Sequence, residues 1–382
     1  MSPIHRTLVT AACSLALSLP ALAQAQAIRI AGLYELSGAG ATAGTNFKNG
    51  VMMAVKEINA AGGILGRKLD ASVSDTQTNP GVAKGLTTKA VDDDVFAIFG
   101  PVFSGSIMVS MAESRRAEIP NFVGGEAASI TKQGNGYVFR TSFTQETAMP
   151  KVARYIANGL KARTVAVIYV NNDFGKGGRD AVIKALTDVG VKVVADISTD
   201  SGQIDFSAPV LKAKQSGADA LFVYTNEEES ARALRELRKQ GYDKPIVGET
   251  TLTGQKVIEL AGDAANGAVA HVGLTIDAPN PLMLAFKAKF YQAYNYFSDH
   301  NGIKGYTGVY LLKAAIEKAG KVDRKAVVQA LHALDVTVAK QPGVLMDVRM
   351  DDKGDLDRES FMVEVKDGRQ IVKQVLPALS KK

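Results

Sequence analysis

Short apolar segments alternate with helical segments along almost the whole chain, and this alternation restricts the possible folds more than any other feature. Apolar or β-branched runs predict ten strands, at residues 28–33, 69–74, 95–99, 119–123, 137–141, 164–170, 191–197, 218–224, 245–248 and 267–273. Helical stretches separate most of these runs, which is the pattern of α/β proteins with parallel sheets. We therefore expect an α/β fold built on parallel central sheets.

The first helix of the chain is predicted from the spacing of its apolar residues. Four apolar residues recur there at spacings of three and four, as one face of a helix requires: Phe47, Val51, Val55 and Ile58. Gly62 follows them and can adopt the left-handed conformation that ends many helices. A second series of the same kind begins at residues 161–164. Two similar, Rossmann-like lobes are therefore expected.

The alternation of predicted strands and helices ends after residue 272. Three successive helices are predicted at 282–296, 306–318 and 324–334, followed by strands at 344–350, 361–365 and 371–375. Asp367-Gly368 between the last two strands is typical of a hairpin turn. We assign residues 28–143 plus 273–355 to an N-terminal lobe, and residues 144–272 plus 356–382 to a C-terminal lobe.

The first 27 residues have the pattern of a secretory signal peptide. Arg6 precedes an apolar run from residue 8 to residue 22, and small residues suited to cleavage follow at Ala23, Ala25 and Ala27. A membrane anchor is the alternative, but the run is too short to span about 30 Å of hydrocarbon. We expect a cleaved signal peptide over residues 1–27 and export to the periplasm.

The composition excludes several classes of function. Cys13 is the only cysteine and lies in the predicted signal peptide, so the mature chain can have no disulfide or thiolate site. The net charge of +6 is spread along the chain without interleaved aromatics, which gives little support to nucleic-acid binding. The four histidines lack metal-ligand spacing, so we predict packing or surface roles for them and no metal or cofactor.

The small-residue loop from Gly38 to Gly44 has two interpretations. After a strand and before a helix, its glycines could cradle the pyrophosphate of a nucleotide cofactor in a secreted α/β enzyme. Alternatively, the loop could form the rim of a cleft that binds a solute. The chain has no Tyr-x-x-x-Lys pair, Gly-x-Ser-x-Gly elbow, Walker loop or His-Glu-x-x-His motif. We therefore expect a binding protein and not an enzyme.

Several motifs resemble a known family. The run Glu57-Ile58-Asn59-Ala60-Ala61-Gly62-Gly63, the pair Gly100-Pro101 and the segment Asn172-Asp173-Phe174-Gly175 resemble type I periplasmic solute-binding proteins of the leucine/isoleucine/valine class. The resemblance extends from residue 28 to about residue 375. It implies two lobes joined by three crossover segments, with a small solute clamped between them. It also implies a monomer that delivers this solute to an ABC permease and its ATPase subunits.

The resemblance places one ligand loop at Ser104, Gly105 and Ser106, where a helix begins. Backbone N–H groups and hydroxyls at such a position suit a carboxylate. The alternative is that Ser104 is only a helix cap. A second ligand loop is implied at Gly125, Glu126 and Ala127. Backbone groups of Gly125 and Ala127 would contact the ligand. Glu126 could instead be a solvated turn residue.

In the second lobe, the resemblance makes Phe174 an aromatic cover for the ligand. An acidic residue of this lobe would pair with an α-ammonium group, and Glu227 and Glu249, the latter followed by Thr250, are the candidates. Either glutamate could instead begin an exposed helix.

Two departures from the leucine-binding pattern concern the ligand. Ala43 stands where leucine-binding members often have a tyrosine, and Glu227 stands where they have another aromatic residue. Loss of both aromatic walls predicts a roomier and more polar site, suited to an amino acid with a polar or cationic side chain or to an amide-like solute. A ligand-sensing domain remains the alternative to a transport role.

Overall fold

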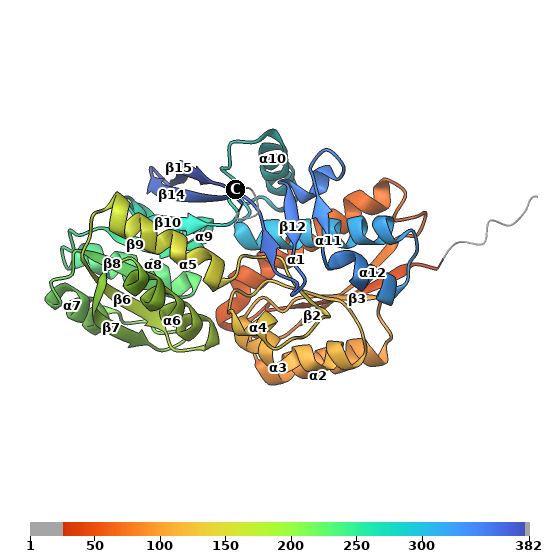
Figure 1. Ribbon diagram of the computed structural model, residues 1–382, viewed down its shortest axis with the longest axis horizontal. Helices are drawn as coiled ribbons and strands as arrows, with labels where there is room; N and C mark the ends of the chain where they lie inside the picture. The colour runs from red at the N-terminus through yellow and green to blue at the C-terminus, as the bar shows by residue number, and fades with distance from the viewer. Residues whose placement is uncertain (1–25, 379–382) are drawn as a thin grey trace, which may run out of the picture.

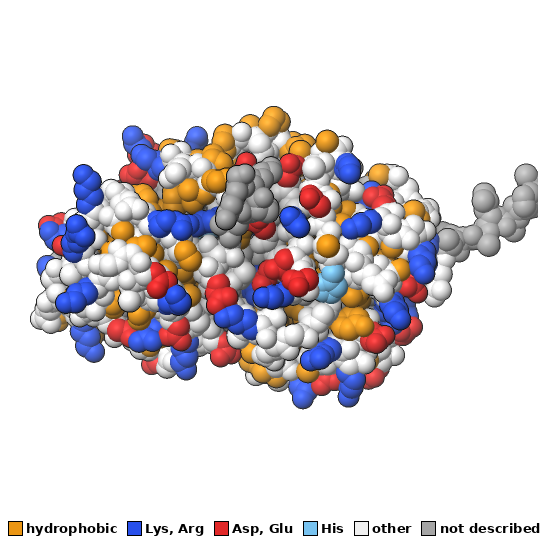
Figure 2. Space-filling view, in the orientation of Figure 1, with side chains coloured by type: hydrophobic (Ala, Val, Ile, Leu, Met, Phe, Trp, Pro, Cys, Tyr) orange, Lys and Arg blue, Asp and Glu red, His pale blue; other side chains and the backbone are white. Residues whose placement is uncertain are grey.

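The computed structural model describes residues 26–378, which form two α/β lobes lying side by side (Figure 1). The predicted signal peptide falls outside the described residues except for residues 26 and 27. None of the helices in this part of the chain is long and apolar enough to cross a membrane. On the face drawn in Figure 2, basic and acidic side chains mingle over both lobes instead of forming one basic patch.

The first lobe is built on a five-stranded parallel sheet. Its strand order is β2-β1-β3-β4-β5. The strands are β1 (Ile28–Tyr34), β2 (Leu69–Asp75), β3 (Ala97–Phe99), β4 (Asn121–Val123) and β5 (Val138–Arg140). The helices that connect them are α1 (Ala41–Ala60), α2 (Pro80–Asp92), α3 (Ser104–Arg116) and α4 (Ser129–Lys132).

The second lobe has a seven-stranded sheet whose order is β15-β14-β10-β9-β8-β6-β7. The parallel strands are β6 (Thr164–Val170), β7 (Lys192–Thr199), β8 (Ala220–Tyr224), β9 (Ile246–Glu249) and β10 (Val269–Val272). The helices are α5 (Gln145–Arg154), α6 (Asp173–Asp188), α7 (Ser207–Gln215), α8 (Glu227–Lys239) and α9 (Gln255–Ala261). Each of the ten predicted strands overlaps one of β1–β10, which confirms the α/β fold.

The later part of the chain adds structure to both lobes. The helices α10 (Pro281–Tyr294), α11 (His300–Ala319) and α12 (Arg324–Leu331) share an apolar core with α1 and β1 of the first lobe. A small antiparallel sheet follows, with strands β11 (Asp335–Val336), β12 (Val348–Met350) and β13 (Leu356–Asp357). The antiparallel strands β14 (Ser360–Lys366) and β15 (Arg369–Leu376) then complete the second sheet.

The chain passes between the lobes three times, at residues 141–144, 273–280 and 358–359. These passages confirm the three crossover segments that the resemblance implies. The predicted hairpin is also present, because Asp367 and Gly368 both have positive φ angles, of 49° and 74°. The strand predicted at 344–350 is shortened to β12, since a 3-10 turn occupies Pro342–Val344 and Leu345 adopts a φ of 62°.

Helix α11 begins at residue 300, six residues before the predicted start. Asp299 causes this earlier start because its carboxylate accepts hydrogen bonds from the N–H groups of Asn301 (2.8 Å) and Gly302 (3.2 Å). The first turns of the helix contain polar residues and glycines, so they lack the apolar spacing on which the prediction relied. These additional turns lie next to the space between the lobes.

Helices α1 and α11 approach each other closely because glycines lie at their contact. A Cβ atom on Gly50 would lie 1.9 Å from the carbonyl oxygen of Gly302, and one on Gly305 would lie 2.1 Å from that of Phe47. Only a hydrogen atom fits at these positions. The close packing therefore fixes the start of α11 against the first lobe.

The glycine contact predicts a large stability difference between two Gly→Ala substitutions. Gly50→Ala should lower the free energy of unfolding by about 1–3 kcal/mol or more, because the added methyl group overlaps the backbone of α11. Gly85→Ala in α2 is the matched control, since no atom lies within 4 Å of the added methyl group. The control should be neutral or stabilising by up to about 1 kcal/mol. Urea denaturation measures both values, and equal stabilities would contradict the proposed packing role.

Candidate functional site

A cavity of about 500 Å³ lies between the two lobes. Loops that follow the carboxyl ends of parallel strands form much of its wall, which is the usual position of ligand sites in α/β sheets. Its volume falls in the range of small-molecule sites. The lobes also contact each other across the cleft, since Thr42 Oγ1 donates a hydrogen bond to Glu228 Oε1 at 2.7 Å.

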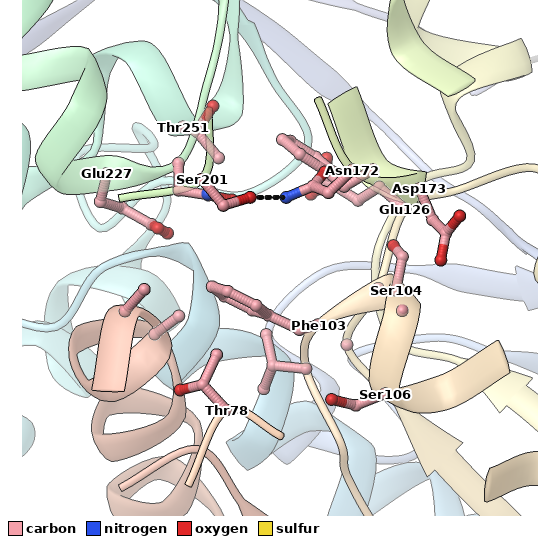
Figure 3. Close-up of a pocket in the computed structure, with 18 of the residues that line it drawn as sticks. Thr78, Phe103, Ser104, Ser106, Glu126, Asn172, Asp173, Ser201, Glu227 and Thr251 are labelled. Carbon is pink, nitrogen blue, oxygen red and sulfur yellow. Dashed lines mark hydrogen bonds between the residues drawn. The ribbon is translucent and has the colours of Figure 1, made fainter. Parts of the chain in front are cut away.

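Seven of the ten predicted ligand-site residues line this cavity: Ser104, Gly105, Ser106, Gly125, Glu126, Phe174 and Glu227. Figure 3 shows Ser104 and Glu227 at opposite ends of the cavity, with the ring of Phe103 between them. The carboxyl group of Glu227 points into the space. On the wall opposite Phe103, Asn172 Nδ2 donates to Ser201 Oγ at 3.2 Å, as the dashed line shows.

Ser104 is the first residue of α3 and does not cap the helix. Phe103 occupies the N-cap position, and no side chain there bonds to the helix. The Ser104 hydroxyl oxygen instead accepts a hydrogen bond from the N–H of Ala127 at 3.3 Å, which ties the two predicted ligand loops together. Ser104, Gly105 and Ser106, the first turn of α3, line one end of the cavity.

Glu35 fixes the loop that leads into α3, and the sequence prediction missed it. Its fully buried carboxylate accepts hydrogen bonds from the N–H groups of Val102 (3.1 Å) and Phe103 (3.0 Å). Burial raises the pKa of this carboxyl group, and the two backbone hydrogen bonds oppose the shift. The signal in the sequence is an acidic residue placed directly after the apolar strand β1.

The carbonyl groups of Gly125 and Ala127 are bonded to other parts of the protein. The fully buried guanidinium of Arg140 donates hydrogen bonds to both of their carbonyl oxygens, and Ser142 Oγ donates to that of Gly125. These carbonyl groups are therefore engaged inside the protein. Ala127 does not line the cavity, because its N–H is bonded to Ser104.

Glu126 is buried, so the interpretation as a solvated turn residue is wrong. Its Oε1 lies 2.9 Å from Nζ of Lys304, and both side chains are less than a tenth exposed. Lys304 Nζ also lies 3.3 Å from the carbonyl oxygen of Gly124. Burial raises the pKa of Glu126 to about 7, although the Lys304 charge lowers it.

Glu249 and Thr250 do not line the cavity. Residues 250–253 form a 3-10 turn after β9, which buries Glu249 and places Thr251 on the wall instead. Glu249 Oε1 accepts a hydrogen bond from Thr250 Oγ1 at 2.6 Å and lies 3.1 Å from Nδ1 of His271. Burial lowers the pKa of His271 to about 3, so this histidine is neutral at physiological pH.

Glu227 is the first residue of α8 and is buried instead of exposed. Asn301 Nδ2 donates a hydrogen bond to its Oε1 at 3.3 Å. Burial raises the pKa of Glu227 to about 8, and the negative charges of Asp299 and Glu228 raise it further. At neutral pH the carboxyl group is thus largely protonated and can donate as well as accept a hydrogen bond.

The cavity has aromatic walls in spite of Ala43. Phe174 lines it and stacks on Tyr224, with ring centroids 4.3 Å apart. Phe103, which was not predicted, lines it from the first lobe. The prediction that the site lacks aromatic walls is therefore wrong, because the loop before α3 supplies the ring of Phe103.

Helix α11 supplies three further lining residues that sequence reasoning missed: His300, Asn301 and Lys304. His300 is therefore a cavity residue, although a packing or surface role was predicted for every histidine. Burial lowers the pKa of His300 well below its usual value, so it is neutral in this setting.

The buried ion pair predicts a pH-dependent loss of stability in Lys304→Met. At pH 8 this substitution should lower the free energy of unfolding by about 3–5 kcal/mol, because it removes the charge that pairs with buried Glu126 and lowers its pKa. At pH 5, below the pKa of Glu126, the loss should be smaller since the carboxyl group is then protonated. Urea denaturation at the two pH values measures the difference.

Lys184→Met is the matched control for this prediction, because Lys184 pairs with Asp188 at 2.6 Å on an exposed surface. It should leave the stability nearly unchanged at both pH values. An equal effect of the two Lys→Met substitutions, or a Lys304→Met effect that grows toward pH 5, would contradict the role assigned to the pair.

Comparisons with known proteins agree with this architecture. A family model described as periplasmic binding protein matches residues 27–370. A leucine-, isoleucine-, valine-, threonine- and alanine-binding protein of Pseudomonas aeruginosa is 30% identical over 349 residues, which cover 89% of this chain and 90% of that protein. A Leu/Ile/Val-binding protein of Rhizobium johnstonii is 29% identical over 355 residues, covering 92% and 95%.

Solved structures show the same fold. The substrate-binding protein of a branched-chain amino acid transporter from Streptococcus pneumoniae, in complex with isoleucine, has a TM-score of 0.82 at 25% identity and covers 92% of this chain and 99% of that one. An ABC transporter solute-binding protein from R. palustris, in complex with benzoate, has a TM-score of 0.84 at 22% identity, with 92% and 97% covered. The chain therefore belongs to the periplasmic binding proteins and is a substrate-binding component of an ABC transporter of the branched-chain amino acid class.

Proposed function

We propose that this protein binds an amino acid or a related small carboxylate in the cavity between its lobes and delivers it to an ABC permease. One observation carries the proposal: the first turn of α3 lines one end of the cavity, with the Ser104 hydroxyl beside its N–H groups. Such a helix start favours an anionic group. The isoleucine and benzoate found in two proteins of the same fold share a carboxylate.

The ammonium group of an amino acid would meet Glu126 and not Glu227. Ser104 is bonded to Ala127, so Glu126 stands at the carboxylate end of the cavity. Glu227 lies at the opposite end (Figure 3). An α-ammonium group is bonded to the carbon atom that carries the carboxylate, so both groups must bind at the same end. This arrangement leaves Glu227 to contact the distant part of the ligand.

The proposal also covers the cellular location of the protein and the proteins that it contacts. The signal-peptide pattern of residues 1–27 supports export and cleavage, and the relatives are periplasmic binding proteins. We propose that the mature protein acts as a monomer in the periplasm and docks on a permease served by ATPase subunits. The family consists of solute-binding proteins, which supports a role without catalysis.

Equilibrium binding tests the proposal directly. Mature protein is unfolded and refolded to remove any bound solute, and a set of amino acids, amides and small carboxylates is then titrated into it calorimetrically. We expect at least one carboxylate ligand to bind with micromolar or tighter affinity, which corresponds to about −8 kcal/mol. Absence of both heat and a thermal shift across the set would contradict the proposal.

The pKa of Glu126 predicts how the affinity depends on pH. An α-amino acid should bind more tightly at pH 8 than at pH 5.5, because its ammonium group favours the ionised form of Glu126, whose pKa is about 7 in the free protein. A carboxylate without an amine should show the opposite trend. Calorimetric titrations at the two pH values measure both trends.

Glu126→Gln should weaken the pH dependence, since its amide does not ionise while Glu227 still does. Glu317→Gln, at an exposed position further along α11, is the control and should retain it. A wild-type affinity for amino acids that is constant from pH 5.5 to pH 8 would show that the ammonium group binds elsewhere.

A further inference from the structure

The cavity has a second polar end that the carboxylate and ammonium groups of a ligand do not use. Glu227 forms this end, with its carboxyl group pointing into the space (Figure 3). Among residues 26–378, no lysine or arginine forms an ion pair with Glu227. The nearby Lys304 is engaged by Glu126, and Asn301 donates one hydrogen bond, at 3.3 Å. The Glu227 carboxyl group can therefore form further hydrogen bonds with a ligand.

Phe103 forms a fixed wall between the two ends. Its backbone N–H is bonded to the buried carboxylate of Glu35 at 3.0 Å. The loop before α1 gives the ring its space, because a Cβ atom on Gly40 would lie 3.1 Å from Cζ of Phe103. A side chain at position 40 would press on the ring. The glycine-rich loop thus makes room for an aromatic side chain from another loop.

Phe174 forms an equally fixed wall on the other lobe. One face of its ring stacks on Tyr224, at a centroid distance of 4.3 Å and an interplanar angle of 25°. Gln145 Nε2 donates hydrogen bonds to the Phe174 carbonyl oxygen (2.7 Å) and to the Tyr224 hydroxyl (3.0 Å), which holds both residues in place. Because Phe174 also lines the cavity, the rest of its ring is left to contact the ligand.

We propose that the ligand is a carboxylate whose flat ring carries a hydrogen-bonding group on the side opposite the carboxylate. The carboxylate binds at the start of α3, the ring lies in the space walled by Phe103 and Phe174, and the polar group bonds to Glu227 and Asn301. Aromatic side chains favour offset stacking or edge contacts with such a ring. The inference rests on the proposed function, because it takes the carboxylate position from it.

Matched ligand pairs test this inference without any variant. L-Tyrosine is compared with L-phenylalanine, and 4-hydroxybenzoate with benzoate, so that the members of each pair differ only in the distant hydroxyl group. In at least one pair, the hydroxylated ligand should bind about 10-fold or more tightly, because a site built to hydrogen-bond a hydroxyl rejects the analogue that lacks it. The pair that binds also shows whether the ligand is an amino acid or a plain aromatic acid.

The flatness of the ligand is tested separately. β-Cyclohexyl-L-alanine has the carbon skeleton of phenylalanine but a puckered ring, so it should bind about 10-fold more weakly than phenylalanine. Benzoate and cyclohexanecarboxylate give the same comparison for acids without an amine. Equal affinities within the pair that binds would overturn the assignment of a flat-ring site.

Two substitutions test which residues cause the hydroxyl preference and the flat-ring preference. Glu227→Met should reduce the affinity ratio within the hydroxyl pair to about 1, and Phe103→Leu should reduce the ratio between flat and puckered rings. The controls are Glu259→Met and Phe297→Leu, which lie outside the cavity lining and should leave both ratios unchanged. A thermal melt of each variant shows that it is folded.

The outcomes separate this inference from the proposed function. If the wild-type protein binds leucine but no ring-containing acid, the flat-ring assignment is wrong while the proposed function stands. If it binds none of these carboxylates, the proposed function itself is wrong. A hydroxyl preference that survives in folded Glu227→Met protein would remove Glu227 from the polar end.

Discussion

The contact between helices α1 and α11 is the packing constraint on which the site depends. Gly50 and Gly305 allow the two backbones to touch, so the first turns of α11 are held beside the cleft. Those turns carry Asn301 and Lys304, which bond to Glu227 of the second lobe and to Glu126 of the first. A wider helix separation would withdraw both polar groups from the cavity wall.

The fold could be predicted in detail because the strands are short apolar runs with little competing signal. β8, for example, consists of five buried apolar residues and β6 is mostly apolar and buried, and the predicted ranges match both strands closely. The start of α11 could not be found in this way, since its first turns have no apolar periodicity. Asp299 was the available signal, because an aspartate before a helix can accept hydrogen bonds from the first N–H groups.

The site was only partly predictable, because the orientation of a side chain depends on contacts that are distant in sequence. Glu227 and Glu249 were both predicted to follow strands of the second lobe, yet Glu249 is the buried last residue of β9, before a 3-10 turn, while Glu227 faces the cavity. Phe103 was missed for a similar reason: its place in the cavity depends on Glu35 and on the small residue at Gly40. Neither contact has a local signature at position 103.

The buried Glu35 has a consequence for the charge of the solute. Its carboxyl group already bonds two N–H groups next to the start of α3, so an anion can use only the N–H groups of the first helical turn. A singly charged carboxylate can be balanced there by the positive end of the helix. A doubly charged phosphate or sulfate would place its second charge near an acidic group already removed from water, at a high electrostatic cost. At the carboxylate position proposed above, Glu35 would therefore disfavour a doubly charged anion.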